Sequence, residues 1–132
     1  MGLPDDAIET TASIVWIEDG IIHLQSKGIT STTDTVTEEV AAVRDLTNGV
    51  PMPVLFDVRG WQKADPEAWL TLISHMLSLF LAAAFVVDPK PSPQLKTFPD
   101  AIDRMLIPVM ISTVEAEAVA FLQGYAGPPP SE

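Results

Sequence analysis

The sequence predicts an α/β protein built on a mixed, mostly parallel five-stranded sheet. Two observations support this fold class. Short apolar runs that are typical of strands alternate along the chain with stretches that carry a helical apolar stripe. The resulting element order is ββαβαβαβα, and strand–helix–strand units form right-handed crossovers between parallel strands.

A hairpin is expected at the start of the domain. Residues 13–18 and 21–26 are rich in β-branched and other apolar side chains. The pair Asp19-Gly20 stands between them and suits a two-residue turn, because glycine readily takes a positive φ. The first strand is therefore expected to lie antiparallel at an edge of the sheet.

A helix and a buried strand follow the hairpin. Two Ser/Thr-x-x-acid patterns, which begin at Ser31 and Thr35, offer caps for the start of the helix. Asn48-Gly49 is expected to end it in a left-handed conformation. The continuous apolar run 53–58 then predicts a strand that is covered on both faces. The inward face of the helix comprises Val36, Val40 and Val43.

The second helix is predicted over residues 66–80, with Asp65 as its N-cap and Pro66 at its first position. A second buried strand is predicted over residues 82–87. The uncharged stretch 68–87 is long enough to span a bilayer, but it lacks a basic flank and changes midway from a helical to a β period. We therefore expect a helix followed by a strand.

The C-terminal part predicts three more elements. A third helix is expected to start at Pro99 and end before Pro108, and a short strand follows at residues 109–112. Ser112 or Thr113 is expected to cap a final helix. The predicted organisation is a flexible arm over residues 1–11, one domain over residues 12–124 and a Pro-rich disordered tail over residues 125–132.

The composition narrows the classes of function. The chain has 132 residues, with 7 Lys and Arg against 18 Asp and Glu, and a formal net charge of -11. Such a chain lacks the basic face that nucleic acids and anionic membranes require, so neither is expected as a partner. It has no cysteine, which excludes disulfides and suits the cytoplasm. No nucleotide-binding glycine motif or hydrolase elbow occurs, so we expect no cofactor, metal or catalytic residue.

Charged side chains gather where two predicted parallel strands end. Asp57 and Arg59 follow the first of these strands, and Asp88 and Lys90 follow the second. The carboxyl ends of parallel strands are where α/β sheets bind ligands, so these four residues are candidates for a small polar site. The alternative, which we favour, is that charges resume wherever buried strands surface and pair locally.

The aromatic and histidine side chains carry weaker signals. Neither His23 nor His75 has a second metal ligand at a suitable spacing, so structural roles are expected. Trp16 and Trp69 are expected in the core. Trp61 follows a glycine in a loop and is a candidate contact residue for a partner protein.

Leucines outside the buried stripe of the second helix predict a contact surface. No charge occurs between Glu67 and Asp88, and Leu70, Leu79 and Leu81 lie off the inward stripe. Exposed apolar patches of this kind commonly mark protein contacts. We therefore expect the chain to associate with itself, as a homodimer, or with another protein.

The element order, together with one segment, resembles a known superfamily. Val54 to Asp57 reads as a buried strand that ends in Asp, and eight residues later Asp65 begins a helix. Over residues 13–123 this resembles the STAS, or SpoIIAA-like, fold of anti-sigma-factor antagonists, whose Asp-Ser-x-Gly-Leu motif places a phosphate-accepting Ser after that Asp. In this sequence the acceptor position is Pro66, so the resemblance implies the scaffold without the phosphorylation. The chain is similar to small bacterial STAS-like proteins of unassigned function.

These observations lead to one functional hypothesis and one alternative. The hypothesis is a non-catalytic protein-interaction or regulatory module that lacks the phosphoacceptor serine. The alternative is a module that binds a small molecule or lipid in a pocket between helix 66–80 and the sheet. An enclosed pocket of about 300 Å³ or more would favour the alternative.

Overall fold

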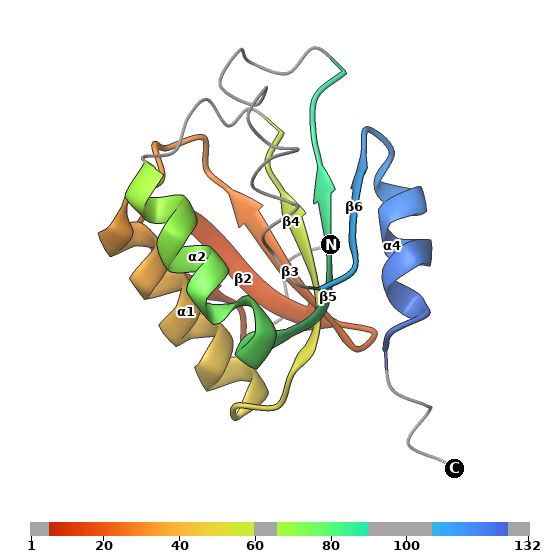
Figure 1. The fold of residues 1–132 in the computed structure, drawn as a ribbon, viewed down its shortest axis with the longest axis horizontal. Coiled ribbons are helices and arrows are strands. Elements are labelled where there is room, and N and C mark those ends of the chain that lie inside the picture. The colour runs from red at the N-terminus through yellow and green to blue at the C-terminus, as the bar shows by residue number, and fades with distance from the viewer. Residues whose placement is uncertain (1–5, 60–65, 90–106, 127–132) are drawn as a thin grey trace.

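The structure is a computed structural model that describes residues 6–59, 66–89 and 107–126 (Figure 1). These residues form three helices and one six-stranded sheet whose strands lie in the order β1-β2-β3-β4-β5-β6. The strands are β1 (Ile8–Glu9), β2 (Ser13–Glu18), β3 (Ile21–Ser26), β4 (Met52–Asp57), β5 (Phe80–Val86) and β6 (Val109–Ser112). The helices are α1 (Thr33–Thr47), α2 (Pro66–Leu79) and α4 (Glu115–Gln123).

The predicted hairpin is confirmed as β2 and β3. The two strands pair antiparallel in a register that runs from Ser13 opposite Ser26 to Glu18 opposite Ile21. Asp19 and Gly20 have φ values of 54° and 78°, so both turn residues are left-handed. This turn matches the natural twist of the paired strands.

The sheet has six strands among the described residues rather than the five predicted, because part of the expected N-terminal arm pairs with it. Ile8 lies opposite Val15, and the side chain of Lys27 forms an ion pair with Glu9. The Thr10 hydroxyl accepts a hydrogen bond from the Ser13 backbone N–H at 3.0 Å and closes the turn between β1 and β2. A two-residue strand is too short to show any periodicity, so the sequence gives no signal for it.

The mostly parallel sheet is confirmed. β3, β4, β5 and β6 pair in parallel as consecutive neighbours, and α1 and α2 form the first two crossovers. The helix predicted from Pro99 lies outside the described residues. The last strand occupies the predicted residues 109–112.

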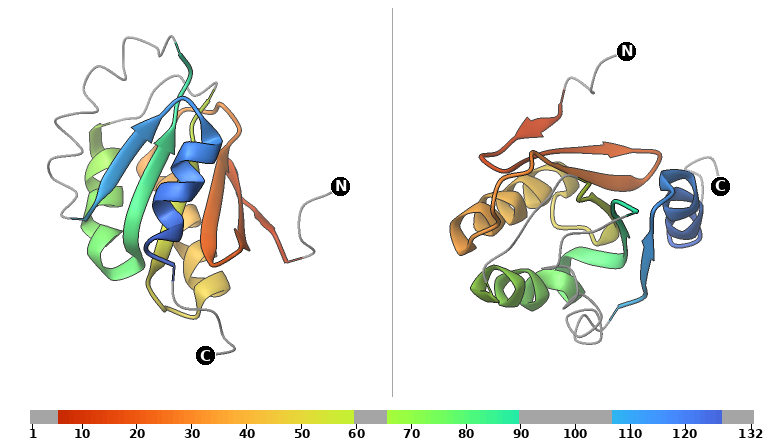
Figure 2. Two further views of the ribbon diagram at one scale, coloured as in Figure 1. Left: turned by 90° about the vertical axis from the view of Figure 1, so that its right-hand side faces the viewer. Right: turned by 90° about the horizontal axis from the view of Figure 1, so that it is seen from above.

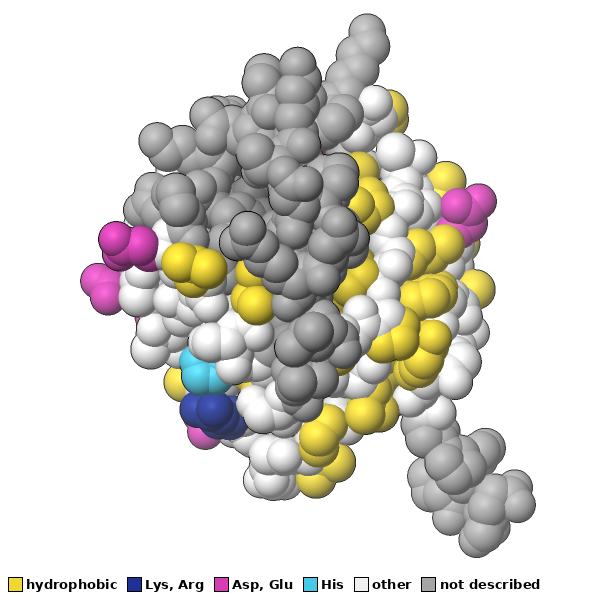
Figure 3. All heavy atoms as spheres, in the orientation of Figure 1, with side chains coloured by type: hydrophobic (Ala, Val, Ile, Leu, Met, Phe, Trp, Pro, Cys, Tyr) yellow, Lys and Arg dark blue, Asp and Glu magenta, His cyan; other side chains and the backbone are white. Residues whose placement is uncertain are grey.

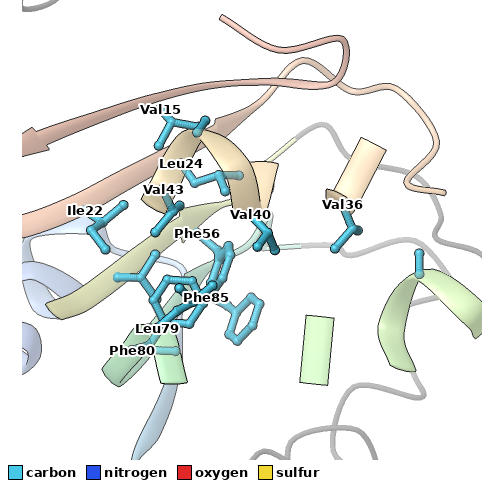
Figure 4. Close-up of a cluster of buried hydrophobic side chains, with 14 of the residues drawn as sticks. Val15, Ile22, Leu24, Val36, Val40, Val43, Phe56, Leu79, Phe80 and Phe85 are labelled. Carbon is cyan, nitrogen blue, oxygen red and sulfur yellow. The ribbon is translucent and has the colours of Figure 1, made fainter. Parts of the chain in front are cut away.

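The helices divide between the two faces of the sheet. Figure 2 shows α1 and α2 side by side over one face, while α4 packs over β4, β5 and β6 on the other. The larger core lies under α1 and α2, where Phe85 stacks on Phe56 with ring centroids 4.8 Å apart (Figure 4). The smaller core joins Leu122 of α4 to Leu55 and to the alternate side chains of β5.

Of the two ends of α1, only the C-terminal one was predicted correctly. Asn48 and Gly49 are left-handed, with φ values of 55° and 80°, as expected. The N-cap is Thr32, and not one of the two predicted residues. The Thr32 side chain accepts from the Thr35 backbone N–H, and the Thr35 hydroxyl accepts from the Thr32 backbone N–H. A hydroxyl therefore replaces the carboxylate that the predicted capping pattern contains.

Helix α2 ends at Leu79 and β5 starts at the next residue, so the predicted change from helix to strand is confirmed. Among the described residues, no helix combines the length and apolar character that crossing a membrane requires.

Leu79 was predicted as a contact residue, which is wrong: its side chain is 3% exposed and packs in the larger core. Because α2 leads directly into the buried strand β5, its last turn lies close to the sheet, and Leu79 is buried there although it lies off the inward stripe.

Leu70 and Leu81 are exposed, with exposed fractions of 58% and 44%. Glu67 lies one turn before Leu70, and the outward positions that follow Leu70 on α2 carry uncharged polar side chains. The hydroxyls of Thr71, Ser74 and Ser78 each donate to a carbonyl one turn earlier in the same helix, which satisfies them without charge.

The carboxyl of Glu39 provides a prediction on pH. Glu39 lies on α1 beside Leu24 and Phe56, and burial raises its pKa, with Glu38 adding to the rise and a hydrogen bond to Ser13 opposing it. A carboxyl whose pKa is higher in the folded state costs stability above that pKa, and the cost disappears as the pH falls toward the unfolded value. We expect Glu39→Gln to raise the free energy of unfolding by about 0.5–1 kcal/mol at pH 7.

Urea unfolding at neutral pH and near pH 4.5 measures this change in the free energy of unfolding. The lower pH is chosen because 4.5 is the ordinary pKa of a Glu carboxyl. The gain from Glu39→Gln should shrink at the lower pH. Glu38→Gln, a matched change on the exposed side of α1, should give a smaller gain. Equal gains for the two variants at both pH values would contradict burial as the cause.

Candidate functional site

A cleft of about 250 Å³ opens on the face of the sheet that carries α4. It lies where β3 and β4 approach their carboxyl ends, beside the first residue of α4. This is the place where open α/β sheets bind ligands. The lining residues are Trp16, His23, Leu24, Gln25, Leu55, Asp57, Arg59 and Glu115.

The register of the strands brings these side chains together. Trp16 of β2 lies opposite His23 of β3, and His23 lies beside Leu55 of β4. Two residues further along, Gln25 lies beside Asp57. Side chains two residues apart on a strand share a face, so His23 with Gln25, and Leu55 with Asp57, point to the same side.

The first wall of the cleft is aromatic. The indole of Trp16 and the imidazole of His23 stack with centroids 5.1 Å apart and planes 9° from parallel. The indole Nε1 donates to Glu18 Oε1 at 3.2 Å, which anchors the outer edge of the ring. Trp16 was predicted in the core, and this is wrong: side chains alternate between the two faces along β2, so Val15 enters the core under α1 and α2 while the half-buried Trp16 lines the cleft on the other face.

The opposite wall is an ionic triad of Asp57, Arg59 and Glu115. Arg59 donates from Nε and Nη2 to the two carboxylate oxygens of Asp57 at 2.9 and 2.7 Å. Its Nη2 also donates to Glu115 Oε1 at 2.9 Å, which ties the end of β4 to the start of α4. Asp57 is buried, whereas the Arg59 and Glu115 side chains are 43% and 50% exposed.

The electrostatics of the two walls differ. Burial lowers the pKa of His23, although the carboxylates of Glu18, Glu115 and Asp19 partly oppose this. The Asp57 hydrogen bonds raise the pKa of the Arg59 guanidinium further above its ordinary value. His23 is therefore a neutral ring at pH 7, and Arg59 stays charged.

The comparisons with known proteins bear on fold and family. A family model described as a domain of unknown function, DUF7793, matches residues 15–126. The chain belongs to the DUF7793 family. A search of curated proteins finds no match. A solved structure similar to this DUF7793 chain is an uncharacterized DUF3478-family protein with a SpoIIAA-like fold from Shewanella loihica PV-4. The two are 11% identical, with a TM-score of 0.60 over 84% of this chain and 92% of that one.

The predicted resemblance is thereby confirmed at the level of fold, which is all that 11% identity supports. In the DUF7793 chain, Pro66 is the first residue of α2. This is the position that the resemblance assigns to the phosphate-accepting serine. The ring of proline suits the first turn of a helix, and it offers no hydroxyl.

The structure brings together half of the predicted polar site. Asp57 and Arg59 line the cleft and pair with each other, as the favoured alternative stated. Asp88 follows β5 and is not among the residues that line the cleft, and Lys90 lies outside the described residues, as does Trp61. A ligand-binding role for Asp57 and Arg59 stays a prediction.

Sequence reasoning missed six of the eight residues that line the cleft: Leu24, Leu55 and the aromatic and polar residues Trp16, His23, Gln25 and Glu115. The Trp16–His23 pair had a signal, because each residue lies three positions from the predicted turn and the two must therefore be cross-strand partners. Glu115 had none, since it is 56 residues from Arg59. In the described ranges, no group of three His, Asp or Glu side chains is arranged to hold a metal ion.

Proposed function

We propose that this DUF7793 protein is a non-catalytic interaction module that is not controlled by phosphorylation at the start of α2. The observation that carries this proposal is Pro66 as the first residue of that helix. The scaffold of an anti-sigma-factor antagonist is kept while the residue that would accept the phosphate is replaced. A module of this kind would act through the surfaces that it presents to a partner.

Exposed apolar side chains support a protein partner or a second copy of the chain. Hydrophobic side chains gather over β6 and α4 on the right of Figure 3. Ile111 and Val114 are among the exposed apolar residues of this region, and Leu70 on α2 and Leu81 on β5 are exposed elsewhere. Apolar side chains left open to water commonly mark sites of protein contact.

The binding of a small ligand is a second candidate, and the described residues favour a place for it other than the one that the sequence suggested. Among the described side chains, the hollow between the sheet and the helices α1 and α2 holds only about 10 Å³. That is room for one water molecule at most. The cleft of about 250 Å³ on the opposite face is the feature that favours this second function.

Phosphorylation assays test the main proposal. After incubation with a serine kinase that acts on SpoIIAA-like proteins, mass spectrometry should find no phosphate on residues 64–68 of the natural chain. Pro66→Ser restores a hydroxyl at the acceptor position and provides the matched variant. Label on Pro66→Ser alone would show that only the missing hydroxyl prevents the reaction. Phosphate on residues 64–68 of the natural chain would refute the proposal.

A further inference from the structure

The cleft beside α4 combines an aromatic wall with an ionic triad. An aromatic wall, Trp16 stacked on His23, faces a hydrogen-bonded ionic triad whose members come from β4, the residues after it and the start of α4. Leu55 provides apolar lining between them, whereas the neighbouring Leu24 side chain points into the larger core on the other face of the sheet. A concave site with apolar walls and a few converging polar groups is the usual form of a small-ligand site.

The charges around the cleft favour a cation. Asp57 and Glu115 line it, and the carboxylates of Glu18 and Asp19 lie close enough to act on His23. Arg59 is the one cation among the described residues that line the cleft. These four carboxylates outweigh the single guanidinium, and the whole chain carries a net charge of -11 that draws cations toward it.

Arg59 does not make the cleft an anion site. Its Nε and Nη2 already donate to Asp57 and Glu115, and both carboxylates would repel an incoming anion. The neutral state of His23 adds no positive charge. A cation, in contrast, would meet the exposed carboxylate of Glu115, the exposed amide of Gln25 and the aromatic wall.

The size of the cleft limits the cation to a small one. Sites for drug-sized molecules occupy about 300–1,000 Å³, and this cleft lies just below that range. Guanidinium fits its features better than a rounder ammonium group, because a planar cation stacks on aromatic rings while its N–H groups reach carboxylates in the same plane.

We propose that the cleft formed by Trp16, His23, Gln25, Leu55 and Glu115 binds a guanidinium group. The group belongs either to an arginine side chain of a partner or to a free guanidino compound. The cleft lies on the face of the sheet opposite α2, so this inference goes beyond the proposed function and does not depend on Pro66. Failure of one would leave the other standing, since labelling of residues 64–68 and cation binding are measured separately.

The test uses two probes that differ in charge and hardly in shape. N-acetyl-arginine amide carries the guanidinium, and N-acetyl-citrulline amide replaces it by a neutral urea. Titration of the full chain, followed by the NMR signals of the His23 ring and the Trp16 indole N–H, should give saturable shifts with the arginine probe alone. Equal shifts with the citrulline probe, or none with either at millimolar concentration, would overturn the proposal.

A matched pair of variants locates the site. Glu115→Gln should weaken binding of the arginine probe by about three- to tenfold, because a charge-assisted contact is lost. Glu38→Gln makes the same change on the exposed side of α1, under the other face of the sheet, and should leave the affinity unchanged. If both variants bind equally well, only general attraction to an acidic protein is at work and the proposed site is wrong.

Two further probes distinguish the sources of the cation. Methylguanidine represents a free guanidino compound, and acetyl-Ala-Arg-Ala-amide represents an arginine within the polypeptide chain of a partner protein. Tighter binding of the peptide would support an arginine of a partner protein. Equal binding of the two per guanidinium would support a free compound, and either result keeps the guanidinium site.

Discussion

Phe85→Ala is expected to lower the free energy of unfolding by about 3–5 kcal/mol, the largest effect of any change considered for this protein. Phe85 lies on β5, which pairs with a strand on each side, is 1% exposed and stacks on Phe56 in the core beneath α1 and α2. Removing the ring leaves a cavity between the sheet and the helices α1 and α2, because the surrounding core relaxes only partly to fill it.

Urea unfolding followed by circular dichroism measures this loss. Domains of this size are stable by about 5–15 kcal/mol, so the variant should show partial unfolding at low denaturant concentration. Leu81→Ala, on the same strand but 44% exposed, is the matched control and should cost less than about 1 kcal/mol. Similar losses for the two variants would contradict the assignment of Phe85 to a close-packed core.

Arg59→Ala is expected to cost about 1–2 kcal/mol of stability at pH 7. The buried carboxylate of Asp57 loses the two donors of the guanidinium side chain and keeps the backbone N–H of residue 59, which lies 3.2 Å away. The cost is below that of a fully buried pair, because the Arg59 side chain is 43% exposed and water replaces part of the lost interaction.

A double-mutant cycle with Asp57→Ala separates the pair from its surroundings. The two changes together should cost less than the sum of the single changes, since each removes the same hydrogen bonds. Glu115→Gln should cost less than about 1 kcal/mol, because both partners in its ion pair with Arg59 are exposed. Strict additivity of Asp57→Ala and Arg59→Ala would show that the bidentate pair does not contribute to stability.

Several elements follow from short stretches of sequence. Asp19-Gly20 between two β-rich runs produces the β2–β3 hairpin, because both turn positions require positive φ. Asn48-Gly49 ends α1 for the same reason. The change from a helical to a β period gives the end of α2 and the start of β5, since the two periods bury different sets of side chains.

The candidate site was only partly predictable. Asp57 and Arg59 lie at the end of a recognisable strand, and their mutual pairing follows from their spacing. The aromatic wall follows from the hairpin register once the turn is known. That these two groups face each other across a cleft follows from the pairing of β3 with β4, which no residue in either strand specifies alone.

The sequence by itself determined the fold class, the β2–β3 hairpin with its turn, the C-terminal end of α1 and the change from α2 to β5, because turns, caps and periodicity depend on near neighbours in the chain. Only the tertiary structure decided that β1 adds a sixth strand, that Leu79 is buried and that Glu115 meets Arg59. Each of these depends on how elements far apart in the chain pack against one another. Such packing is set by the sum of many weak contacts over the whole domain, so no single position of the sequence predicts it.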